Sequence, residues 1–374
     1  MEQHIRVAIA GLGNCASSLI QGINFYNTVS EGDDIPGLLH PVIGGYRPSD
    51  IDIVAAFDID ERKVGKDVSD AIFSKPNNTK IFCESIHPTG TIVSRGPTFD
   101  GYPGHFEDYS DDIRPMESKL PAVDVVNILK ETKPDILVSY LPVGSQQATE
   151  HYANACLEAG VSFANAIPVF IASVPEYQKK FAAKGLVCAG DDIKSQVGAT
   201  IVHRVLTDLF KNRGVKLNRT YQLNFGGNTD FLNMLERSRL ISKKISKTEA
   251  VQSQLPEPLP KKNIHIGPSD FVEWLNDNKV CYIRMEGNGF GNVPMEIELR
   301  LSVEDSPNSA GVMIDVIRLC KTALDNGITG YLDEVSSFAF KHPTRQYADS
   351  DVFKNLEAFI ARLSRKEPAK TAFV

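Results

Sequence analysis

The strongest constraint on the fold is a glycine-rich turn close to the start of the chain. The stretch "VAIAGLGNCAS" places Gly11, Gly13 and Ala16 in a GxGxxA arrangement, directly after an apolar run and at the start of a helical pattern. In such a turn the first glycine makes the bend, the second admits a pyrophosphate, and the small third residue packs helix on strand. The helix N-terminus then faces the phosphates. The motif predicts a dinucleotide-binding unit, and a tight strand–helix turn without a ligand is the alternative.

The first half of the chain continues this alternation. Apolar, β-branched runs bounded by turn residues lie at 5–11, 51–58, 135–142, 161–168 and 186–192. Helical patterns lie between several of them, at 14–27, 60–73, 122–133 and 145–159. Strands that alternate with helices indicate a doubly wound parallel sheet in a Rossmann-like α/β fold. Two stretches rich in turn residues, 28–50 and 84–118, are expected to be irregular.

The pattern changes after the helical stretch 197–214. The segments "TYQLNFGGN", "KNIHIGP", "KVCYIRMEG" and "MEIELRLSVED" alternate polar and apolar residues with little helix between the later ones. This predicts an antiparallel sheet that faces a helix layer or another subunit. A strong helical pattern returns at 306–327, with Ser306 as N-cap, Pro307 at the first helical position and Gly327 after the end.

Composition excludes several classes of protein. The 374 residues are enough for two domains, and the net charge of −7 argues against a general nucleic-acid binder. Six cysteines without a CxxC pair indicate reduced thiols. The sequence shows no signal-peptide pattern and no run of 18 or more apolar residues, so we expect a cytoplasmic protein without a membrane span.

The second strand of the predicted sheet ends in an acid that bears on the choice of cofactor. Asp58 closes "IDIVAAFD" and is the candidate partner of the adenosine ribose. It lies farther from the glycines than the usual spacing of about 20 residues, and the 28–50 insertion explains the difference. An acid here favours NAD over NADP, although Arg62 lies close by.

Charged and polar residues lie where strands are expected to end, which is where ligands bind in open α/β sheets. They are Asp191, Asp192, Lys194 and Ser195 in "GDDIKSQVGAT", Asn228 and Asp230 in "FGGNTD", Asp305 in "EDSPN", Lys243 and Lys247 in "SKKISK", Lys279 in "NDNK", and Lys341 in "FKHP". Each has a bland reading as surface charge or helix-terminus chemistry. Together they predict an anionic small-molecule substrate and lysines that carry protons. There is no GxSxG or HExxH motif and no paired zinc spacing, Cys83 and His87 being the nearest, so we expect no metal ligands.

Nine motifs resemble those of the myo-inositol-1-phosphate synthase family in its shorter bacterial and archaeal form. They are "GLGNCASSLIQG", "AAFDID…KVGKDVSDAIF", "LVSYLPVGS", "NAIPVFIAS", "GDDIKSQVGAT", "NFGGNTDFLNM", "SKKISKT", "HIGPSDFVEWL" and "DSPNSAGVMIDVIRL", and the resemblance runs from about residue 5 to 345. It implies a Rossmann-like NAD-binding domain at 1–200, completed by 307–374. It further implies an inserted α+β catalytic and tetramerisation domain at 201–306, and hence a homotetramer.

The resemblance also implies an isomerase that uses NAD and regenerates it. The substrate, D-glucose 6-phosphate in its open form, would be oxidised at C5, enolised, closed by attack of C6 on the C1 aldehyde, and reduced again to 1L-myo-inositol 1-phosphate. The implied catalytic residues are Lys243, Lys247, Lys279, Lys341, Asp192, Asp230, Asp305 and Asn228. The implied cofactor contacts are Gly11, Gly13, Asn14, Cys15, Asp58, Asp67, Tyr152 and Ser195, with Asp230 and Lys243 near the nicotinamide.

Within this set, Lys243 is expected to relay a proton at C5 with Asp230, and Lys341 to assist there. Lys247 and Lys279 are expected to hold phosphate and enolate or aldehyde oxygens. The sequence leaves open a divalent or monovalent cation and the fate of the product in a phospholipid, a thiol cofactor or a compatible solute. It also leaves open a simple dehydrogenase, a cyclase of another sugar phosphate, and a non-catalytic NAD-binding regulator.

Overall fold

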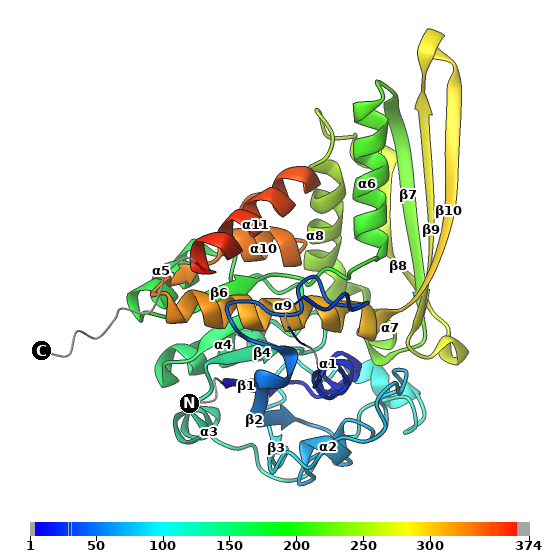
Figure 1. Ribbon diagram of the computed structural model, residues 1–374. Coiled ribbons are helices and arrows are strands. Elements are labelled where there is room, and N and C mark those ends of the chain that lie inside the picture. The colour runs from blue at the N-terminus through cyan, green and yellow to red at the C-terminus, as the bar shows by residue number, and fades with distance from the viewer. Residues whose placement is uncertain (1–3, 29, 31, 365–374) are drawn as a thin grey trace, which may run out of the picture.

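A computed structural model describes residues 4–28, 30 and 32–364, and its larger sheet is parallel throughout (Figure 1). Within these residues the strands lie in the order β11-β6-β5-β4-β1-β2-β3. Without β11 this is the usual Rossmann order of 3-2-1-4-5-6 read from the other edge. The strands are β1 (Ile5–Ala10), β2 (Ile51–Asp58), β3 (Ser94–Arg95), β4 (Ile136–Ser139), β5 (Ser162–Asn165), β6 (Val187–Gly190) and β11 (Gly330–Tyr331). The predicted α/β class with a parallel sheet is confirmed.

Each face of this sheet carries its own core, because alternate side chains of a strand point to opposite faces. Val7 and Ile9 of β1 pack with α1, α9 and α11, while Ala8 and Ala10 face a second cluster with α3, α4 and α5. The helices are α1 (Asn14–Phe25), α3 (Val125–Thr132), α4 (Gln146–Ala159), α5 (Pro175–Ala183), α9 (Asp305–Asp325) and α11 (Asp349–Ser364). Burial on both faces is what the near-continuous apolar strands predict.

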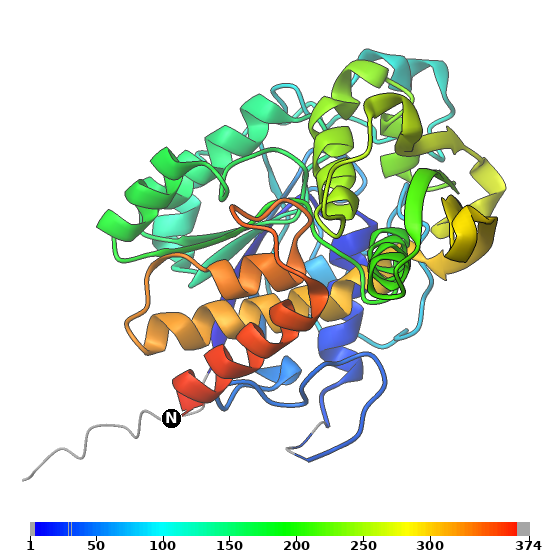
Figure 2. The same ribbon diagram turned by 90° about the horizontal axis from the view of Figure 1, so that it is seen from above.

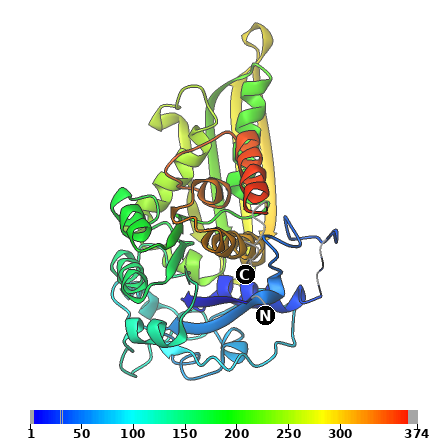
Figure 3. The same cartoon turned by 60° about the vertical axis from the view of Figure 1, so that its left-hand side comes forward.

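The smaller sheet stands at an angle to the first and has the order β10-β9-β7-β8 (Figures 1 and 3). Its strands are β7 (Lys216–Gly226), β8 (Ile264–Phe271), β9 (Asn278–Asn288) and β10 (Pro294–Glu304). The expectation of an antiparallel sheet is wrong for one pair, because β7 and β8 run parallel. Parallel neighbours need a crossover, and α7 (Thr229–Asn233), the 3-10 turn Arg237–Leu240 and α8 (Ile241–Gln252) form it. Helix α6 (Ala199–Asn212) packs on this sheet through Phe210.

After the smaller sheet the chain returns to the larger one along α9. Figure 2 shows α9, α10 (Asp333–Ala339) and α11 packed beside one another, and β11 then pairs with β6. The predicted start of α9 is wrong: the helix begins at Asp305 with Glu304 as its N-cap residue. Ser306 does not cap the helix, because its N–H and hydroxyl both donate to Asp277. The end is as expected, with Gly327 in a left-handed conformation at φ +71°.

One predicted helix is much shorter than expected. Of the stretch 60–73, only α2 (Val68–Ala71) is helical, since Gly65 adopts φ +86° and Asp67 caps the helix that follows. The described residues of 28–50 and the stretch 84–118 are largely irregular as predicted, apart from the two-residue strand β3 and the 3-10 turns Pro48–Asp50 and Gly104–Asp108. Further 3-10 turns are Lys261–Asn263, Glu273–Leu275 and Phe290–Asn292. All six cysteines lie in described ranges and are free thiols. Within those ranges no helix is long and apolar enough to cross a membrane.

Candidate active site

A cavity lies where the carboxyl ends of the larger sheet meet α7, α8 and the start of α9. Its lining brings together residues predicted from distant parts of the sequence. They are Gly11, Gly13, Asn14, Cys15, Asp58, Tyr152, Asp192, Ser195, Asn228, Asp230, Lys243, Lys247, Lys279, Asp305 and Lys341. This position outside the strand ends is the usual ligand site of open α/β sheets.

Three lysines of the cavity are each paired with an aspartate. Lys243 Nζ lies 2.8 Å from Asp230 Oδ2, and Lys279 Nζ lies 3.0 Å from Asp305 Oδ1. Lys341 Nζ donates to Asp192 Oδ1 at 2.7 Å. The other oxygen of Asp192 accepts the Ser246 hydroxyl of α8. The pairs therefore connect the segment after β6 with α7, α8, β9, the start of α9 and the end of α10 around one cavity.

Lys247 is the exception among these lysines. It is 4% exposed, and no described residue pairs with its ammonium group by an ion pair or hydrogen bond. Burial lowers the pKa of Lys247 well below its ordinary value, and the neighbouring lysine charges lower it further. An anionic ligand would relieve both penalties, since a buried charge is costly unless it is paired.

The aspartates stay ionised despite their burial. Burial opposes ionisation of Asp305, but the Lys279 ammonium outweighs it and lowers the pKa of that carboxyl. The same competition at Asp192 is won by Lys341, and the pKa of Asp192 is lowered. Lys341, by contrast, has a lowered pKa because burial outweighs its partner. The cavity thus holds fixed carboxylates beside two lysines, Lys247 and Lys341, whose pKa values are lowered.

The glycine turn borders the same cavity and fits a dinucleotide. A Cβ on Gly13 would meet nothing within 4 Å, so this glycine leaves open space over the start of α1. No side chain caps the N-terminus of α1, and free N–H groups at a helix start suit a pyrophosphate. Gly11 serves the turn itself, since it adopts φ +91° and a Cβ there would lie 2.7 Å from the Tyr140 carbonyl oxygen.

Asp58 lies at the end of β2 and is held from within the protein. Its Oδ2 accepts the Leu12 N–H at 2.7 Å and its Oδ1 accepts the Asp60 N–H at 2.8 Å. The buried Lys63 ammonium lies 3.8 Å from Asp58 and donates to the Leu12 carbonyl at 3.0 Å. Arg62, which left NADP open, is instead engaged by Asp60 at 2.6 Å.

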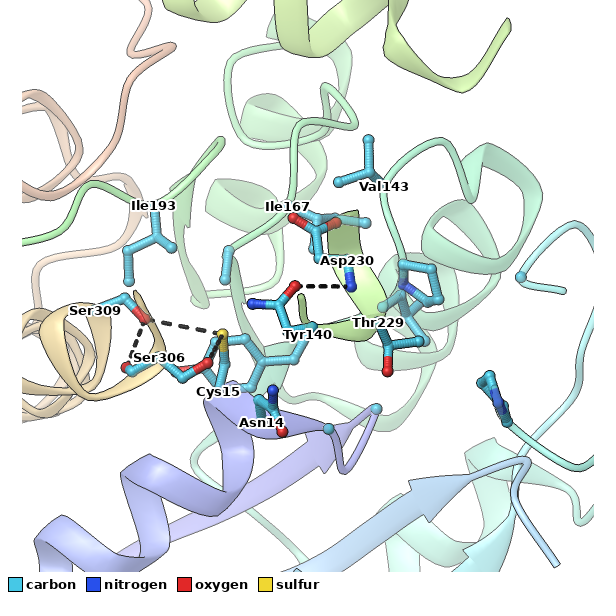
Figure 4. A pocket seen from close by; sticks show the side chains of 18 of the residues that line it. Asn14, Cys15, Tyr140, Val143, Ile167, Ile193, Thr229, Asp230, Ser306 and Ser309 are labelled. Atoms are coloured by element: carbon cyan, nitrogen blue, oxygen red, sulfur yellow. Dashed lines mark hydrogen bonds between the residues drawn. The ribbon is translucent and has the colours of Figure 1, made fainter. Parts of the chain in front are cut away.

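Figure 4 shows how α1, α7 and α9 converge on the cavity. Asn14 and Cys15 come from the start of α1, and Asp230 from α7. The Cys15 Sγ lies 3.7 Å from the Ser306 hydroxyl oxygen and 3.8 Å from that of Ser309. Burial, with nearby carboxylates, raises the pKa of Cys15 to about 12. Cys15 is therefore a neutral thiol that packs the glycine turn against α9.

One predicted cofactor residue lies elsewhere. Asp67 is not part of the cavity lining. Its carboxylate instead caps α2 through Ser69 and accepts N–H groups of Thr89 and Gly90. These hydrogen bonds lower the pKa of Asp67 to about 2 against the effect of burial. Its position supports a structural role in the loop, not contact with a cofactor.

Among the described residues, no three or more His, Cys, Asp or Glu side chains are grouped so that they could hold a metal ion.

Comparison with known proteins identifies the family. Inositol-3-phosphate synthase of Mycolicibacterium smegmatis is 54% identical over 367 residues, which cover 96% of this chain and 99% of that protein. Inositol-3-phosphate synthase of Corynebacterium glutamicum is 53% identical, and the match covers 95% of this chain and 98% of that protein. The chain belongs to the inositol-3-phosphate synthase family.

Two further findings agree with membership of the synthase family. The family model described as myo-inositol-1-phosphate synthase matches residues 198–306, the segment with three of the five lysines that line the cavity. A myo-inositol-1-phosphate synthase-related protein from Thermotoga maritima has the same fold, with a TM-score of 0.80 at 23% identity over 96% of this chain and 98% of that one. The resemblance read from the sequence motifs is confirmed.

Several residues at this synthase site were not predicted from the sequence as site residues. Lys63, Tyr140, Ser306 and Ser309 line the cavity, and Ser246 contacts Asp192. Lys63 and Ser246 lie in quoted motifs, but single polar residues there gave no separate signal. Asp277 lies just outside the lining and precedes Lys279 by two residues in "NDNK". An acid so near a predicted catalytic lysine was the sequence signal that could have identified Asp277.

Proposed function

We propose that this protein is an isomerase that converts D-glucose 6-phosphate to 1L-myo-inositol 1-phosphate, the compound that its relatives' name calls inositol 3-phosphate. The observation that carries the proposal is the unpaired Lys247 ammonium, which lies beside three lysine–aspartate pairs in a cavity bordered by Gly13. A sugar phosphate supplies the missing anion, and the glycine turn supplies a place for a dinucleotide.

NAD, when bound, accepts the C5 hydride and later returns it, so none is consumed. Gly11, Gly13, Asn14 and Cys15 hold the diphosphate end of the site in this proposal. Asp58 faces the adenosine ribose, and Tyr152 and Ser195 border the same cavity. The acid at position 58 favours NAD over NADP.

Proton transfer at C5 falls to Lys243. As the C5–H bond breaks, the C5 hydroxyl loses a proton to Lys243, which shares it with Asp230 across 2.8 Å. The same proton returns when C5 is reduced. Lys341, whose pKa is lowered by burial, assists at C5. A base with a lowered pKa is suited to this exchange near neutral pH.

Ring closure develops negative charge that cations must stabilise. A C6 proton passes to a base of the site to give an enolate, C6 then bonds to the C1 aldehyde carbon, and the same base returns the proton to the aldehyde oxygen. Lys247 and Lys279 hold the phosphate and these oxygens in our proposal. Asp305 fixes Lys279, and Asn228 caps α7, which carries Asp230.

We also propose an NAD-binding domain of residues 1–200 and 307–374, an inserted domain of residues 201–306, and a cytoplasmic homotetramer. The inserted segment exposes large apolar side chains, including Trp274, Phe290 and Val293 at 82%, 101% and 61%. These three side chains lie in the turns at the two ends of β9, and exposed large apolar side chains are typical of an interface. Light scattering of the purified protein tests the assembly, and a monomeric mass would contradict it.

The test of function uses purified protein, glucose 6-phosphate and catalytic NAD, followed by phosphorus NMR and absorbance of NADH. Inositol phosphate formed in excess over NAD, without lasting NADH, is the expected result. NADH that rises with substrate loss would instead identify a dehydrogenase. No turnover with bound NAD would point to another sugar phosphate or a non-catalytic regulator. Parallel assays with added monovalent or divalent cations test the cation requirement.

A further inference from the structure

A buried carboxylate outside the cavity lining connects the walls of the site. Asp277 lies between the 3-10 turn Glu273–Leu275 and β9, and it is 1% exposed. Its backbone is fixed as well, because its carbonyl accepts the Asp305 N–H at 3.0 Å. The neighbouring Asn276 carbonyl accepts the Gly227 N–H at 2.9 Å.

Both carboxylate oxygens of Asp277 are used. Oδ1 accepts hydrogen bonds from Asn228 at 2.9 Å, the Ser306 hydroxyl at 2.9 Å and Asn14 at 3.1 Å. Oδ2 accepts the Thr79 hydroxyl at 2.8 Å and the Ser306 N–H at 3.0 Å. These donors come from α1, the loop before residue 80, α7 and α9, so one carboxylate joins four separate segments.

Two of these donors hold opposite halves of the site. Asn14 opens the helix that follows the glycine turn, whereas Asn228 caps α7 by accepting the Asp230 and Phe231 N–H groups. With its amide nitrogen on Asp277, Asn228 is left with its oxygen toward α7, which fixes the segment that carries Asp230. Burial, with the charge of Asp305, raises the pKa of Asp277 to about 6. At neutral pH the group is therefore an ionised acceptor, as its donors require.

We infer that Asp277 is a positioning residue. It holds the glycine turn and the Lys243–Asp230 pair in the relative positions that hydride transfer needs. The inference rests on the proposed function. Asp277 acts through Asn14, Asn228 and Ser306, and not on the substrate. A displacement of about 1 Å in such a site can cost about 100-fold in rate.

The test is Asp277→Asn, which keeps the shape but turns an N–H₂ group toward donors. We expect kcat to fall about 10- to 100-fold with a smaller change in KM. Glucose 6-phosphate deuterated at C5 should show a larger isotope effect on kcat than in the wild type, because hydride transfer becomes more rate-limiting. Calorimetry should show a higher dissociation constant for NAD, since Asn14 loses one of its hydrogen bonds, the one to Asp277.

The matched control is Asp315→Asn. This variant neutralises a different buried acid, which lies on α9 and is paired with Arg318 away from the cavity. It should lower Tm without changing the isotope effect or NAD affinity. If Asp277→Asn lowers only Tm and the active fraction in the same way, the positioning role is wrong.

Thr79→Val serves if Asp277→Asn does not fold, because it removes one donor to Asp277 from outside the cavity lining. It should shift kcat and the isotope effect in the same direction by a smaller factor, and wild-type values would overturn the inference. If the wild type makes no inositol phosphate, the proposed function fails. The NAD affinities of the same variants then still decide the role of Asp277.

Discussion

Lys243 and Lys247 lie one turn apart on α8, and only Lys243 has a carboxylate partner among the residues that the structure describes. Lys243 donates to Asp230 at 2.8 Å, while Lys247 faces the same cavity among other lysines. Like charges at this spacing destabilise a helix, and burial adds a further cost. The arrangement is therefore unfavourable to folding and suited to binding an anion.

Lys247→Met should separate stability from function. Removal of a buried, unpaired ammonium should raise Tm by about 1 °C for each kcal/mol relieved, while turnover falls about 100-fold or more. The matched control is Lys244→Met, which changes an exposed lysine of the same helix that lies outside the cavity. Differential scanning calorimetry and the phosphorus NMR assay measure both quantities. Lower Tm in Lys247→Met would contradict this account of its burial.

Lys243→Ala and Lys279→Ala should each abolish turnover. The first removes the proton acceptor at C5, and the second removes the cation held by Asp305 at 3.0 Å. The loss of Lys279 also leaves a buried carboxylate unpaired, which costs about 3–5 kcal/mol in comparable pairs. Circular dichroism must therefore confirm the fold before rates are compared. Near-normal turnover in either folded variant would refute its assignment.

The two glycines of the turn should fail in different ways. Gly11→Ala places a Cβ 2.7 Å from a backbone oxygen at φ +91°, so it should destabilise the protein by about 1–3 kcal/mol. Gly13→Val meets open space and should fold normally. It should weaken NAD binding at least about tenfold, or about 1.4 kcal/mol, because its side chain takes the room of the pyrophosphate. Equal losses of Tm in both variants would argue against a phosphate site at Gly13.

His203 should make stability depend on pH away from the cavity. Its ring nitrogens contact Gln222 and Thr220, and burial lowers the pKa of His203 to about 4. The unfolded protein, with a pKa near 6.5, takes up the proton first as pH falls. Stability present above pH 6.5 is thus lost between about 6.5 and 4, by about 3 kcal/mol at 1.36 kcal/mol per pKa unit. Urea unfolding of His203→Gln should show a shallower loss than wild type, and parallel curves would rule this out.

The sequence predicted the larger sheet well, because its signals are local. The glycine turn, β-branched runs and helix patterns each report on their own segment, and the Rossmann order then follows from the connections. The prediction failed where a distant residue decides. Ser306 looks like an N-cap in isolation, but Asp277 takes its hydroxyl and N–H, and α9 starts one residue earlier than Ser306.

The candidate site shows the same division. Lysines and acids at strand ends were predictable as a group, since strand ends converge in parallel sheets. The pairing of Lys341 with Asp192 was not, because the two residues are joined only by the returning C-terminal segment. The parallel pairing of β7 and β8 could not be predicted either, because the residue pattern of a strand does not show whether its neighbour runs parallel or antiparallel. Asp67 lies outside the cavity lining and its carboxylate caps α2, so its contact with a cofactor stays a prediction.

The return of the polypeptide along α9 has a consequence for biosynthesis. Strand β6 pairs with β11 on its outer side, and α9 and α11 help to cover one face of the larger sheet. A growing polypeptide therefore cannot complete its first core until the smaller sheet has been translated. Such late, long-range closure slows folding and leaves apolar surface exposed in the meantime. Truncation before α9 should consequently give an aggregating fragment, not an independent dinucleotide-binding module.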